Sequence, residues 1–459
     1  MNLKNKKVLV MGLGLHGGGV GVARWLVKSG AKVTITDLKN KEQLKSSIAK
    51  LKGLPVKYVL GRHNKNDFIK TDLIVKNPGV PDDSEFLKIA ARNKVPVDTD
   101  IALFVKNCPA PIIGITGTKG KTTTTTLVGE IFKAAGRAPV VAGNIRVSPL
   151  DFLSKIKKDG SVILELSSWQ LEGLDACGFS PHVSLITNIT PDHLNRYQSF
   201  DHYVAAKAII FRYQKSDDVC ILNRDNAPTK KFGAIVPGKR LWFSLKYFKE
   251  ENGSYQKNGW IWFRHNGREQ RILPIKEIVL PGNHNFSNVL AAVALASICG
   301  IKPGVIRLVV KKFKGIPYRL ELIRELRGVK YYNDTAATAP DGAINALRTL
   351  GKGKNIVLIA GGADKKLFFK DFAAAIKKHV KATILFKGSA TPKIKRELLK
   401  VNYWAVTEVD SMVAALTAAN KLAKKGDIVL LSPGCASFGL FINEFDRGDQ
   451  FTAQVKKIK

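Results

Sequence analysis

The chain has 459 residues, too many for one compact core, and this length predicts about three domains. Hydrophobic residues make up 45% and charged residues 24% of the sequence, which indicates a globular protein, and no window approaches the roughly 20 apolar residues that a membrane span needs. Lysine and arginine number 74 against 37 aspartate and glutamate, but they are spread along the chain without a basic tail, which favours solvated surface charge over nucleic-acid binding.

The five cysteines are scattered, odd in number and without a C-x-x-C pair, so the sequence predicts neither a disulfide framework nor a zinc site. The basic and apolar N-terminus runs into glycines without a cleavage site of the A-x-A type, which favours a first β-strand over a secretory signal. We therefore expect a cytoplasmic monomer with no nucleic-acid partner and no insertion into a membrane.

The first strand is predicted at residues 7–11, followed by the glycine turn G-L-G-L-H-G-G (12–18) and a helix. A second strand (32–36) delivers Asp37 at its carboxyl end, where a dinucleotide-binding fold places a ribose-binding acid. The same pattern occurs in proteins that bind NAD, FAD or a UDP-sugar, and a turn with a purely structural role remains an alternative.

A further strand at 72–75 leads into the turn N-P-G-V-P (77–81). The segment N-C-P-A-P (107–111) then has the proline content of a linker, and we place the first domain boundary there.

The most informative stretch of the chain is I-I-G-I-T-G-T-K-G-K-T-T (112–123). An apolar strand feeds a glycine-rich turn similar to the pattern G-x-x-x-x-G-K-T, with Gly120, Lys121 and Thr122 on its last three fixed positions, and an amphipathic helix follows. Glycines let main-chain N–H groups face phosphate oxygens, the lysine bridges the terminal phosphates, and the hydroxyl holds Mg²⁺. The sequence therefore predicts an ATP-binding loop.

Polar residues follow the next two predicted strands of this domain. Glu165 ends the strand at 161–166, and the pair Asp192-His193 follows the strand at 183–188. Ligands bind at the carboxyl ends of strands in open α/β sheets, so we expect these side chains near the ATP phosphates, where a carboxylate can hold Mg²⁺.

The rest of the central segment gives weaker signals. Lys207 lies inside a mostly apolar helix, where an isolated lysine is by default a snorkelling side chain. Aromatic alternation over 241–275 predicts small β-hairpins. Asn285 and Asn288 lie on one face at the start of an alanine-rich helix, and both a capping role and a nucleotide contact are open.

Strands and helices alternate again after residue 315, which predicts another mostly parallel sheet. The fold class is therefore α/β with three domains, namely a Rossmann-like N-terminal domain (1–109), a central domain of the P-loop ATPase type (110–315) and a Rossmann-like C-terminal domain (316–459). In the last domain we expect strands at 329–332, 355–360 and 427–431 and helices at 342–350, 369–378 and 412–424.

Together these motifs resemble the Mur ligase family over nearly the whole chain, and most closely its members that add D-glutamate. The matching stretches are G-T-K-G-K-T-T (117–123), G-N-I (143–145), E-L-S-S-W-Q-L-E (165–172), T-P-D-H-L-N-R-Y (190–197), A-A-K (205–207), G-N-H-N-x-x-N (282–288), G-I-P-Y-R (315–319), N-D-T (333–335) and L-S-P-G-C-A-S-F (431–438).

The resemblance implies a ligase of peptidoglycan precursor synthesis that joins D-glutamate to UDP-N-acetylmuramoyl-L-alanine through an acyl phosphate, with ATP and two Mg²⁺ ions. It implies catalytic roles for Lys121, His193 and Lys207. The implied ATP contacts are Gly117, Thr118, Lys119, Gly120, Lys121, Thr122, Thr123, Asn285, Asn288, Arg319 and Asp334.

The same resemblance assigns the first domain to the UDP-substrate and the last to the amino acid. The implied UDP-substrate contacts are Leu15, Asp37, Asn77, Gly79, Asn144 and His193, and the implied amino-acid contacts are Lys365, Ser437 and Phe438. The implied metal ligands are Thr122, Glu165, His193 and, once carbamylated, Lys207.

Two departures from the family pattern bear on specificity. Ala336 stands where the family usually has a lysine that helps to bind the carboxylate of the incoming amino acid, and H-G-G-G (16–19) replaces the commoner T-G pattern. Lys366 could substitute for that lysine, or a different amino acid could be used. The alternatives are therefore a related amide ligase with another acceptor amino acid and a non-catalytic nucleotide-binding protein.

Overall fold

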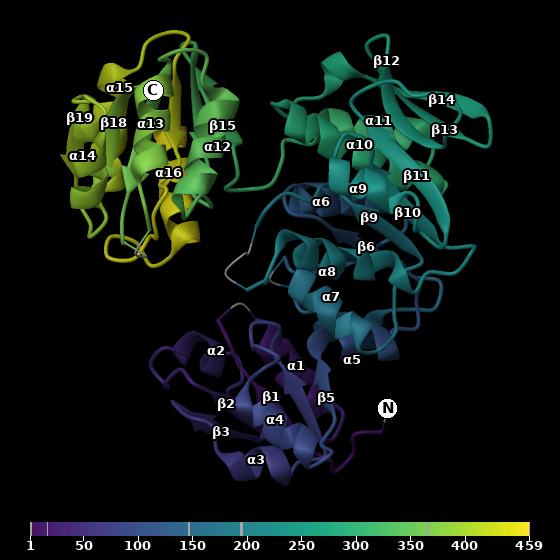
Figure 1. Ribbon diagram of the computed structural model, residues 1–459. Helices are drawn as coiled ribbons and strands as arrows, with labels where there is room; N and C mark the ends of the chain where they lie inside the picture. Colours follow the sequence, from purple (N-terminus) through teal and green to yellow (C-terminus); the bar gives the residue numbers. More distant parts are fainter. Residues whose placement is uncertain (1, 16, 146, 193–195, 365–366, 459) are drawn as a thin grey trace. The chain divides into compact units, whose positions relative to one another are not determined.

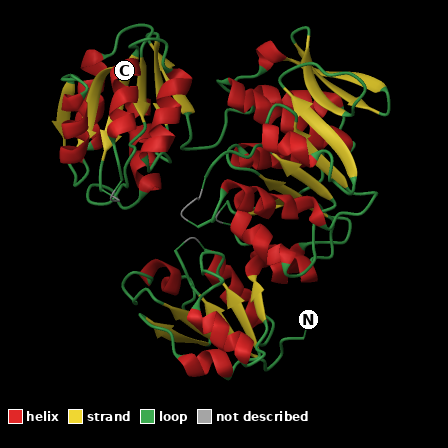
Figure 2. Ribbon diagram, in the orientation of Figure 1, coloured by secondary structure: helices red, strands yellow, loops and turns green. Residues whose placement is uncertain are grey.

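The computed structural model describes residues 2–15, 17–145, 147–192, 196–364 and 367–458. It is an α/β protein whose strands form three sheets, each covered by helices (Figure 1, Figure 2). The chain divides into two compact units. One unit comprises residues 1–278 and 283–312 and holds the first two sheets, and the other comprises 279–282 and 313–459 and holds the third.

The first sheet has five parallel strands in the order β3-β2-β1-β4-β5. Strand order reverses beside β1, so the crevice at the carboxyl ends of β1 and β4 is the position where such folds bind ligands. Its elements are β1 (Lys7–Met11), α1 (Gly18–Lys28), β2 (Lys32–Asp37), α2 (Lys45–Ala49), β3 (Val56–Leu60), α3 (Lys65–Ile69), β4 (Leu73–Lys76), α4 (Glu85–Arg92), β5 (Val97–Thr99) and α5 (Asp100–Asn107).

The second sheet has nine strands in the order β14-β13-β12-β11-β10-β9-β6-β8-β7. The predicted hairpins are present, and they continue the parallel part of the sheet as antiparallel strands. The strands are β6 (Ile112–Thr116), β7 (Val140–Gly143), β8 (Val162–Glu165), β9 (Val183–Ile186), β10 (Val219–Asn223), β11 (Lys239–Ser244), β12 (Gly253–Lys257), β13 (Trp260–His265) and β14 (Arg268–Pro274).

The helices of this second sheet cover both of its faces, and α6, which follows the phosphate loop, packs against α10. They are α6 (Lys121–Ala134), η1 (Pro149–Lys155), α7 (Ser168–Asp175), α8 (Phe200–Arg212), α9 (Ala227–Phe232), η2 (Ile275–Glu277), α10 (Asn283–Ile298) and α11 (Pro303–Lys312). Among the described residues, none of the helices combines the length and the apolar character needed to cross a membrane.

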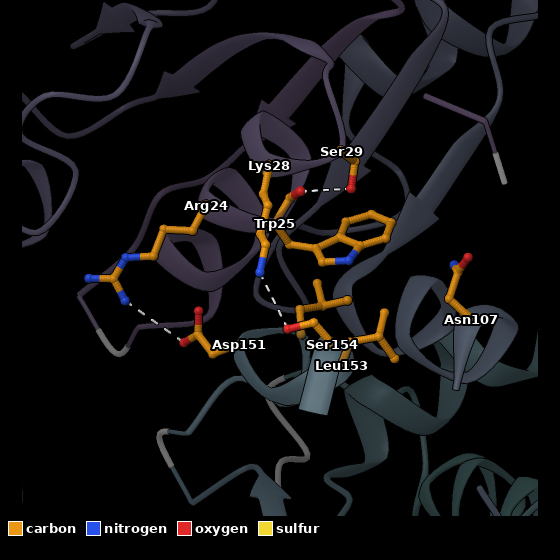
Figure 3. A pocket seen from close by; sticks show the side chains of 9 residues that line it. Arg24, Trp25, Lys28, Ser29, Asn107, Asp151, Leu153 and Ser154 are labelled. Atoms are coloured by element: carbon orange, nitrogen blue, oxygen red, sulfur yellow. Dashed lines mark hydrogen bonds and ion pairs between the residues drawn. The ribbon is translucent and has the colours of Figure 1, made fainter. Parts of the chain in front are cut away.

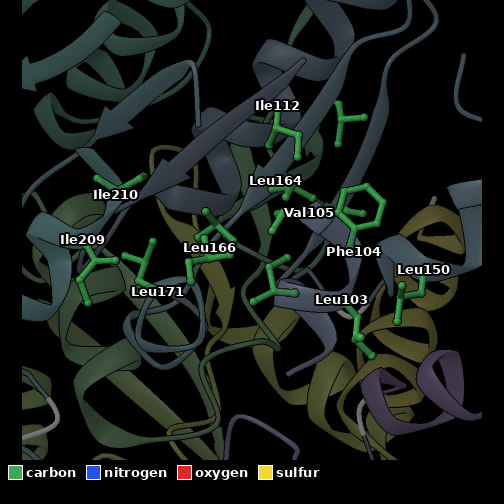
Figure 4. Close-up of a cluster of buried hydrophobic side chains, with 14 of the residues drawn as sticks. Leu103, Phe104, Val105, Ile112, Leu150, Leu164, Leu166, Leu171, Ile209 and Ile210 are labelled. Atoms are coloured by element: carbon green, nitrogen blue, oxygen red, sulfur yellow. The ribbon is translucent and has the colours of Figure 1, made fainter. Parts of the chain in front are cut away.

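One hydrophobic core continues from the first sheet into the second through α5. Leu103 and Phe104 of α5 belong to the same buried cluster as Ile112, Leu164 and residues of α8 (Figure 4). Removing each such side chain from water stabilises the fold by about 1.5–3 kcal/mol. The two sheets therefore form one compact unit.

The third sheet has the order β15-β16-β20-β17-β18-β19, in which the β15–β16 pair is antiparallel and the other pairs are parallel. The predicted strands and helices are present, and the sequence analysis missed β15, β18, β19, α14 and α16. The elements are β15 (Glu321–Leu326), β16 (Val329–Asn333), α12 (Pro340–Leu350), β17 (Ile356–Gly361), α13 (Lys370–His379), β18 (Val380–Phe386), α14 (Thr391–Lys400), β19 (Val406–Val409), α15 (Met412–Leu422), β20 (Ile428–Leu431) and α16 (Glu444–Lys457).

Candidate active site

The loop between β6 and α6 is held in a fixed shape by its own lysine. Nζ of Lys121 donates to the main-chain oxygens of Gly117 at 2.9 Å and Thr118 at 3.0 Å. This bridging places the ammonium inside the curve of the loop, at the N-terminus of α6. Helix N-termini carry partial positive charge and free N–H groups, so the loop and the lysine together make an anion-binding site.

Two glycines of this loop are required by close contacts. Gly117 has φ +145° and Gly120 has φ +84°, both in the region that favours glycine. A Cβ on Gly117 would lie 2.0 Å from Oγ1 of Thr187, and a Cβ on Gly120 would lie 2.2 Å from Oδ1 of Asn288. Asn288 of α10 therefore lies directly against the phosphate loop.

The segment after β9 fixes the outer side of the loop. The main-chain N–H of Thr118 donates to Asn188 O at 2.8 Å, and that of Lys119 donates to Asn188 Oδ1 at 3.0 Å. Oγ1 of Thr187 returns a hydrogen bond to Lys119 O at 2.6 Å. Sequence analysis missed Thr187 and Asn188, which it placed inside the predicted strand at 183–188 and which directly follow β9 in the structure.

Glu165 ends β8, next to β6 in the sheet, and its side chain is 1% exposed. Oε1 accepts a hydrogen bond of 2.7 Å from Nδ2 of Asn144, whereas Oε2 is buried without a hydrogen-bond partner among the described residues. A buried carboxylate oxygen left unpaired is costly unless a cation or a donor joins it. The contact between Glu165 and Asn144, which sequence analysis did not predict, leaves Oε2 as the oxygen that lacks a partner among the described residues.

Lys207 of α8 does not snorkel to the surface, because its side chain is only 1% exposed. Nζ donates to Oγ1 of Thr116, the last residue of β6, at 3.1 Å. Burial and then the positive charge of Lys121 hold the pKa of Lys207 well below its usual value, while the carboxylates of Asp192 and Glu165 oppose that shift. A lysine with a lowered pKa is more often uncharged, and an uncharged amine can be modified.

The described acidic side chains fit a metal ion only in part. The unpaired oxygen of Glu165 suits a divalent cation, and Thr122, the second residue of α6, carries a hydroxyl at the phosphate loop. The described residues contain no cluster of three or more His, Cys, Asp or Glu side chains that could hold a metal. His193, a predicted ligand, lies outside the described residues. The described donors, Glu165 and Thr122, carry oxygen atoms of the kind that bind magnesium.

Asn285 and Asn288 are both buried on α10, and Nδ2 of Asn288 lies 3.5 Å from Oδ1 of Asn285. Neither is exposed as an ordinary surface cap would be. Because Asn288 also borders Gly120, the structure brings this predicted pair to the phosphate loop.

At the first sheet, the carboxylate of Asp37 folds back onto the glycine turn. Oδ2 accepts from Gly14 N at 3.1 Å, and Oδ1 accepts from Lys39 N at 2.9 Å. Asn77 closes an Asx turn by accepting from Gly79 N at 3.0 Å. A Cβ on Gly12 would lie 2.9 Å from Cβ of Asn77, so the two turns touch.

These turns border a pocket of about 410 Å³ at the carboxyl edge of the first sheet. Its size is in the range of about 300–1,000 Å³ typical of small-molecule sites. Apolar walls come from Met11, Val80 and Phe86, and His63, which sequence analysis missed, is among the polar residues that line it. Leu15 lies on the same turn and is exposed.

Arg196 connects this edge to the second sheet. Its guanidinium donates to Pro78 O at 3.3 Å and to Glu172 at 3.2 Å, and it stacks over the ring of Trp169. The turn at 77–81 is therefore fixed to α7, which starts directly after Glu165 and Ser167.

A second pocket, of about 610 Å³, lies between α1 and η1 (Figure 3). Lys28 donates to Ser154 Oγ at 3.3 Å, and Arg24 lies 3.9 Å from Asp151. None of the predicted site residues that the structure describes lines it.

In the second unit, Asp334 is buried at the end of β16. It accepts hydrogen bonds from Ser432 Oγ at 2.6 Å and from Leu320 N at 3.1 Å, and burial raises its pKa to about 7. Arg319, one residue before Leu320, is exposed and lowers that pKa through its charge. The predicted pair of Arg319 and Asp334 is thus brought together.

The loops that carry Thr335 and Cys435 are tied by Arg447, which sequence analysis missed. This fully buried guanidinium donates to Thr335 Oγ1 at 2.9 Å, to Thr335 O at 3.0 Å and to Cys435 O at 3.4 Å. Ser437, two residues after Cys435, is buried, and Phe438 is 66% exposed.

The remaining predicted contacts of the second unit are less informative. Lys365 and the possible substitute Lys366 lie outside the described residues. Ala336 is half-buried, and its N–H donates to Tyr318 O at 3.0 Å.

Three Mur ligase domain families match the chain in order. The Mur ligase MurD-like N-terminal domain matches residues 6–98, the Mur ligase middle domain matches 115–296, and the Mur ligase glutamate ligase domain matches 318–435. A curated relative from Roseiflexus sp. (strain RS-1), named UDP-N-acetylmuramoylalanine--D-glutamate ligase, is 45% identical over 98% of both chains. One of the same name from Thermoanaerobacter sp. (strain X514) is 40% identical over the whole of both.

Solved structures agree at the level of the fold. The UDP-N-acetylmuramate-alanine ligase of Thermotoga maritima aligns with a TM-score of 0.61 at 21% identity, over 99% of this chain and 100% of that one. A pseudomurein peptide ligase type C from Methanothermus fervidus aligns with a TM-score of 0.56 at 20% identity and the same coverage. The class of protein is defined by the three family matches and by the full-length relatives. The chain belongs to the Mur ligase family.

Proposed function

We propose that the chain is an ATP-dependent ligase that joins D-glutamate to UDP-N-acetylmuramoyl-L-alanine during the synthesis of peptidoglycan precursors. The observation that carries this proposal is the 45% identity, over 98% of both chains, to a relative named for that reaction. The grouping of the Lys121 loop, Glu165 and Lys207 at one edge of the second sheet supports it.

The phosphate loop supplies the ATP site of this proposal. Main-chain N–H groups of residues 117–123 and the N-terminus of α6 hold phosphate oxygens, and Lys121 exchanges its two carbonyl partners for the terminal phosphates. Asn285, Asn288, Arg319 and Asp334 are assigned to the rest of the nucleotide.

Glu165, Thr122, His193 and a carbamylated Lys207 are assigned to two Mg²⁺ ions. Carbamylation would replace a buried ammonium, which repels metal ions, by a carboxylate-like group. When bound, Mg²⁺ neutralises the negative charge that develops on the transferred phosphoryl group. Nδ2 of Asn144 donates a hydrogen bond to Oε1 of Glu165, so Oε2 is the oxygen that remains to bind a metal ion.

Most of the proposed substrate contacts follow the two other sheets, and Asn144 and His193 belong to the central domain. Leu15, Asp37, Asn77, Gly79, Asn144 and His193 are assigned to the UDP-substrate, and Lys365, Ser437 and Phe438 to D-glutamate. The domains carrying these sites are proposed as 1–109 for the UDP-substrate, 110–315 for ATP and 316–459 for the amino acid. We also propose that the protein is a cytoplasmic monomer.

The reaction has two covalent steps. A carboxylate oxygen of the alanyl group attacks the γ-phosphorus of ATP, the bond from γ-phosphorus to the bridging oxygen breaks, and ADP leaves. The amine of D-glutamate then attacks the acyl carbon, phosphate leaves, and the amine proton passes to base. In the first step, the positive charge of Lys121 stabilises the negative charge that develops on the transferred phosphoryl group.

Ala336 favours one alternative, a ligase of the same mechanism with a different acceptor amino acid. No side-chain charge is available at this position to bind a second carboxylate.

The test is phosphate release from ATP and Mg²⁺ with UDP-N-acetylmuramoyl-L-alanine, comparing D-glutamate with L-glutamate and other amino acids. Turnover with D-glutamate alone supports the proposal. Turnover with another amino acid moves the specificity and keeps the mechanism, and the absence of turnover with every amino acid contradicts both.

A further inference from the structure

His63 lies at the carboxyl end of β3, beside the end of β2 that carries Asp37. It lines the pocket of about 410 Å³ together with Met11, Asp37, Asn77 and Phe86. The imidazole packs edge-on against Phe86, with ring centroids 4.9 Å apart, and against Phe68 at 5.7 Å. These aromatic contacts fix the plane of the ring at the pocket wall.

A hydrogen-bond relay fixes the tautomer of this ring. Oγ1 of Thr36 lies 2.7 Å from Nδ1 of His63 and 3.2 Å from Arg62 O. A hydroxyl has one hydrogen, and the carbonyl of Arg62 can only accept, so we assign the hydroxyl hydrogen to that carbonyl. Nδ1 of His63 then donates to Oγ1, and Nε2 keeps a lone pair.

Nε2 of His63 makes no hydrogen bond to any residue that the structure describes. Burial lowers the pKa of His63, with the carboxylate of Asp37 opposing the shift, so the ring is neutral at neutral pH. Asp37, another acceptor of this wall, already accepts through both of its oxygens, from Gly14 N and from Lys39 N.

An uncommitted acceptor on a pocket wall recognises an N–H group. Uracil carries such a group at N3, between two carbonyls, whereas N3 of cytosine is itself an acceptor and would face the Nε2 lone pair. A site built to accept from a ligand N–H rejects an analogue that lacks it, because the buried acceptor is then unpaired.

We propose that His63 is the residue that selects uracil, with Nε2 accepting a hydrogen bond from N3–H of the base in the pocket of the first sheet. This inference rests on the proposed use of a UDP-linked substrate, and it names the side chain that reads the base.

The test measures binding of UDP, CDP and N3-methyl-UDP to the full chain by isothermal titration calorimetry. Loss of one hydrogen bond corresponds to roughly threefold to tenfold weaker binding. We expect the wild type to bind UDP tighter than both analogues by about this factor. His63→Ala should weaken UDP binding and bring the three affinities together, and His265→Ala, on β13, serves as the matched control that keeps the wild-type ratios.

Equal binding of UDP and N3-methyl-UDP by the wild type would overturn the inference, and this comparison decides it even if His63→Ala does not fold. Retention of the wild-type ratios by a folded His63→Ala variant would overturn it too. Absence of UDP binding alongside normal ligase turnover overturns this inference alone, whereas absence of both overturns the proposed function with it.

Discussion

The two glycine-rich loops of the first unit share a strand–turn–helix plan and differ in the charge at the turn. Each helix begins after a left-handed glycine, Gly17 at φ +92° before α1 and Gly120 at φ +84° before α6. In the first loop the carboxylate of Asp37 accepts from Gly14 N, whereas in the second the ammonium of Lys121 bridges two carbonyls.

This difference in charge indicates which part of a nucleotide each loop can bind. A carboxylate already bound to a loop amide repels terminal phosphates and suits hydroxyl donors, and a lysine inside the loop neutralises phosphate charge. The strand ends behind the loops also differ, because β1 ends in the buried apolar Met11 and β6 ends in Thr116, which accepts from the buried Lys207.

The largest effect should come from removing the charge of the second loop. Lys121→Ala is expected to lower ligase turnover by about 100-fold to 1,000-fold, the usual loss when a transition-state donor is removed. The measurement is phosphate release at saturating ATP. Lys133→Ala is the matched control, because this lysine is exposed in the last turn of the same helix, α6, away from the phosphate loop. Similar losses in both variants would contradict the assignment of charge to Lys121.

A pair of glycine substitutions should separate the two loops. Gly120→Ala places a Cβ 2.2 Å from Asn288, and Gly12→Ala places one 2.9 Å from Asn77, each at a positive φ. Left-handed strain of about 1–2 kcal/mol predicts roughly a tenfold rise in one Michaelis constant. We expect Gly120→Ala to raise KM for ATP and Gly12→Ala to raise KM for the UDP-substrate. If either variant raised both constants equally, the loops would not be separate sites.

Asp37→Asn removes the charge of the first loop while retaining its shape. One amide oxygen still accepts from Lys39 N, but the acceptor of Gly14 N becomes an NH₂ group or is lost. A charged hydrogen bond is worth about 1.5–3 kcal/mol, so KM for the UDP-substrate should rise about tenfold or more while KM for ATP stays within twofold. Steady-state kinetics with each substrate varied in turn checks this, and an unchanged KM for the UDP-substrate would exclude the assigned role.

The smallest effect concerns the two strand ends. Thr116→Val removes the only described acceptor of Lys207 Nζ and should lower the free energy of unfolding by about 1–3 kcal/mol, since a buried polar group is left unpaired. Met11→Leu, at the matching position, conserves volume in an apolar site and should cost less than about 1.5 kcal/mol. Urea denaturation of both variants provides the comparison, and equal losses would show that the Lys207 contact contributes nothing.

The sequence by itself determined the α/β class, the phosphate loop and the strand-end positions of Glu165 and Asp37, because fixed spacing and apolar runs encode local structure. It also led to the family through motifs. It did not give β15, β18 and β19, although β15 and β18, with six and seven residues, are no shorter than the predicted β16, β17 and β20.

Only the tertiary structure determined which side chains that are distant in the sequence come into contact. Asn288 lies against Gly120, Lys207 is buried against Thr116, and Arg447 ties Thr335 to Cys435, over separations that no local pattern encodes. Sequence analysis took a surface position as the default for Lys207, and folding buried the side chain because α8 packs its apolar face onto the sheet. His63 was missed for the same reason, since its role depends on the pairing of β3 with β2.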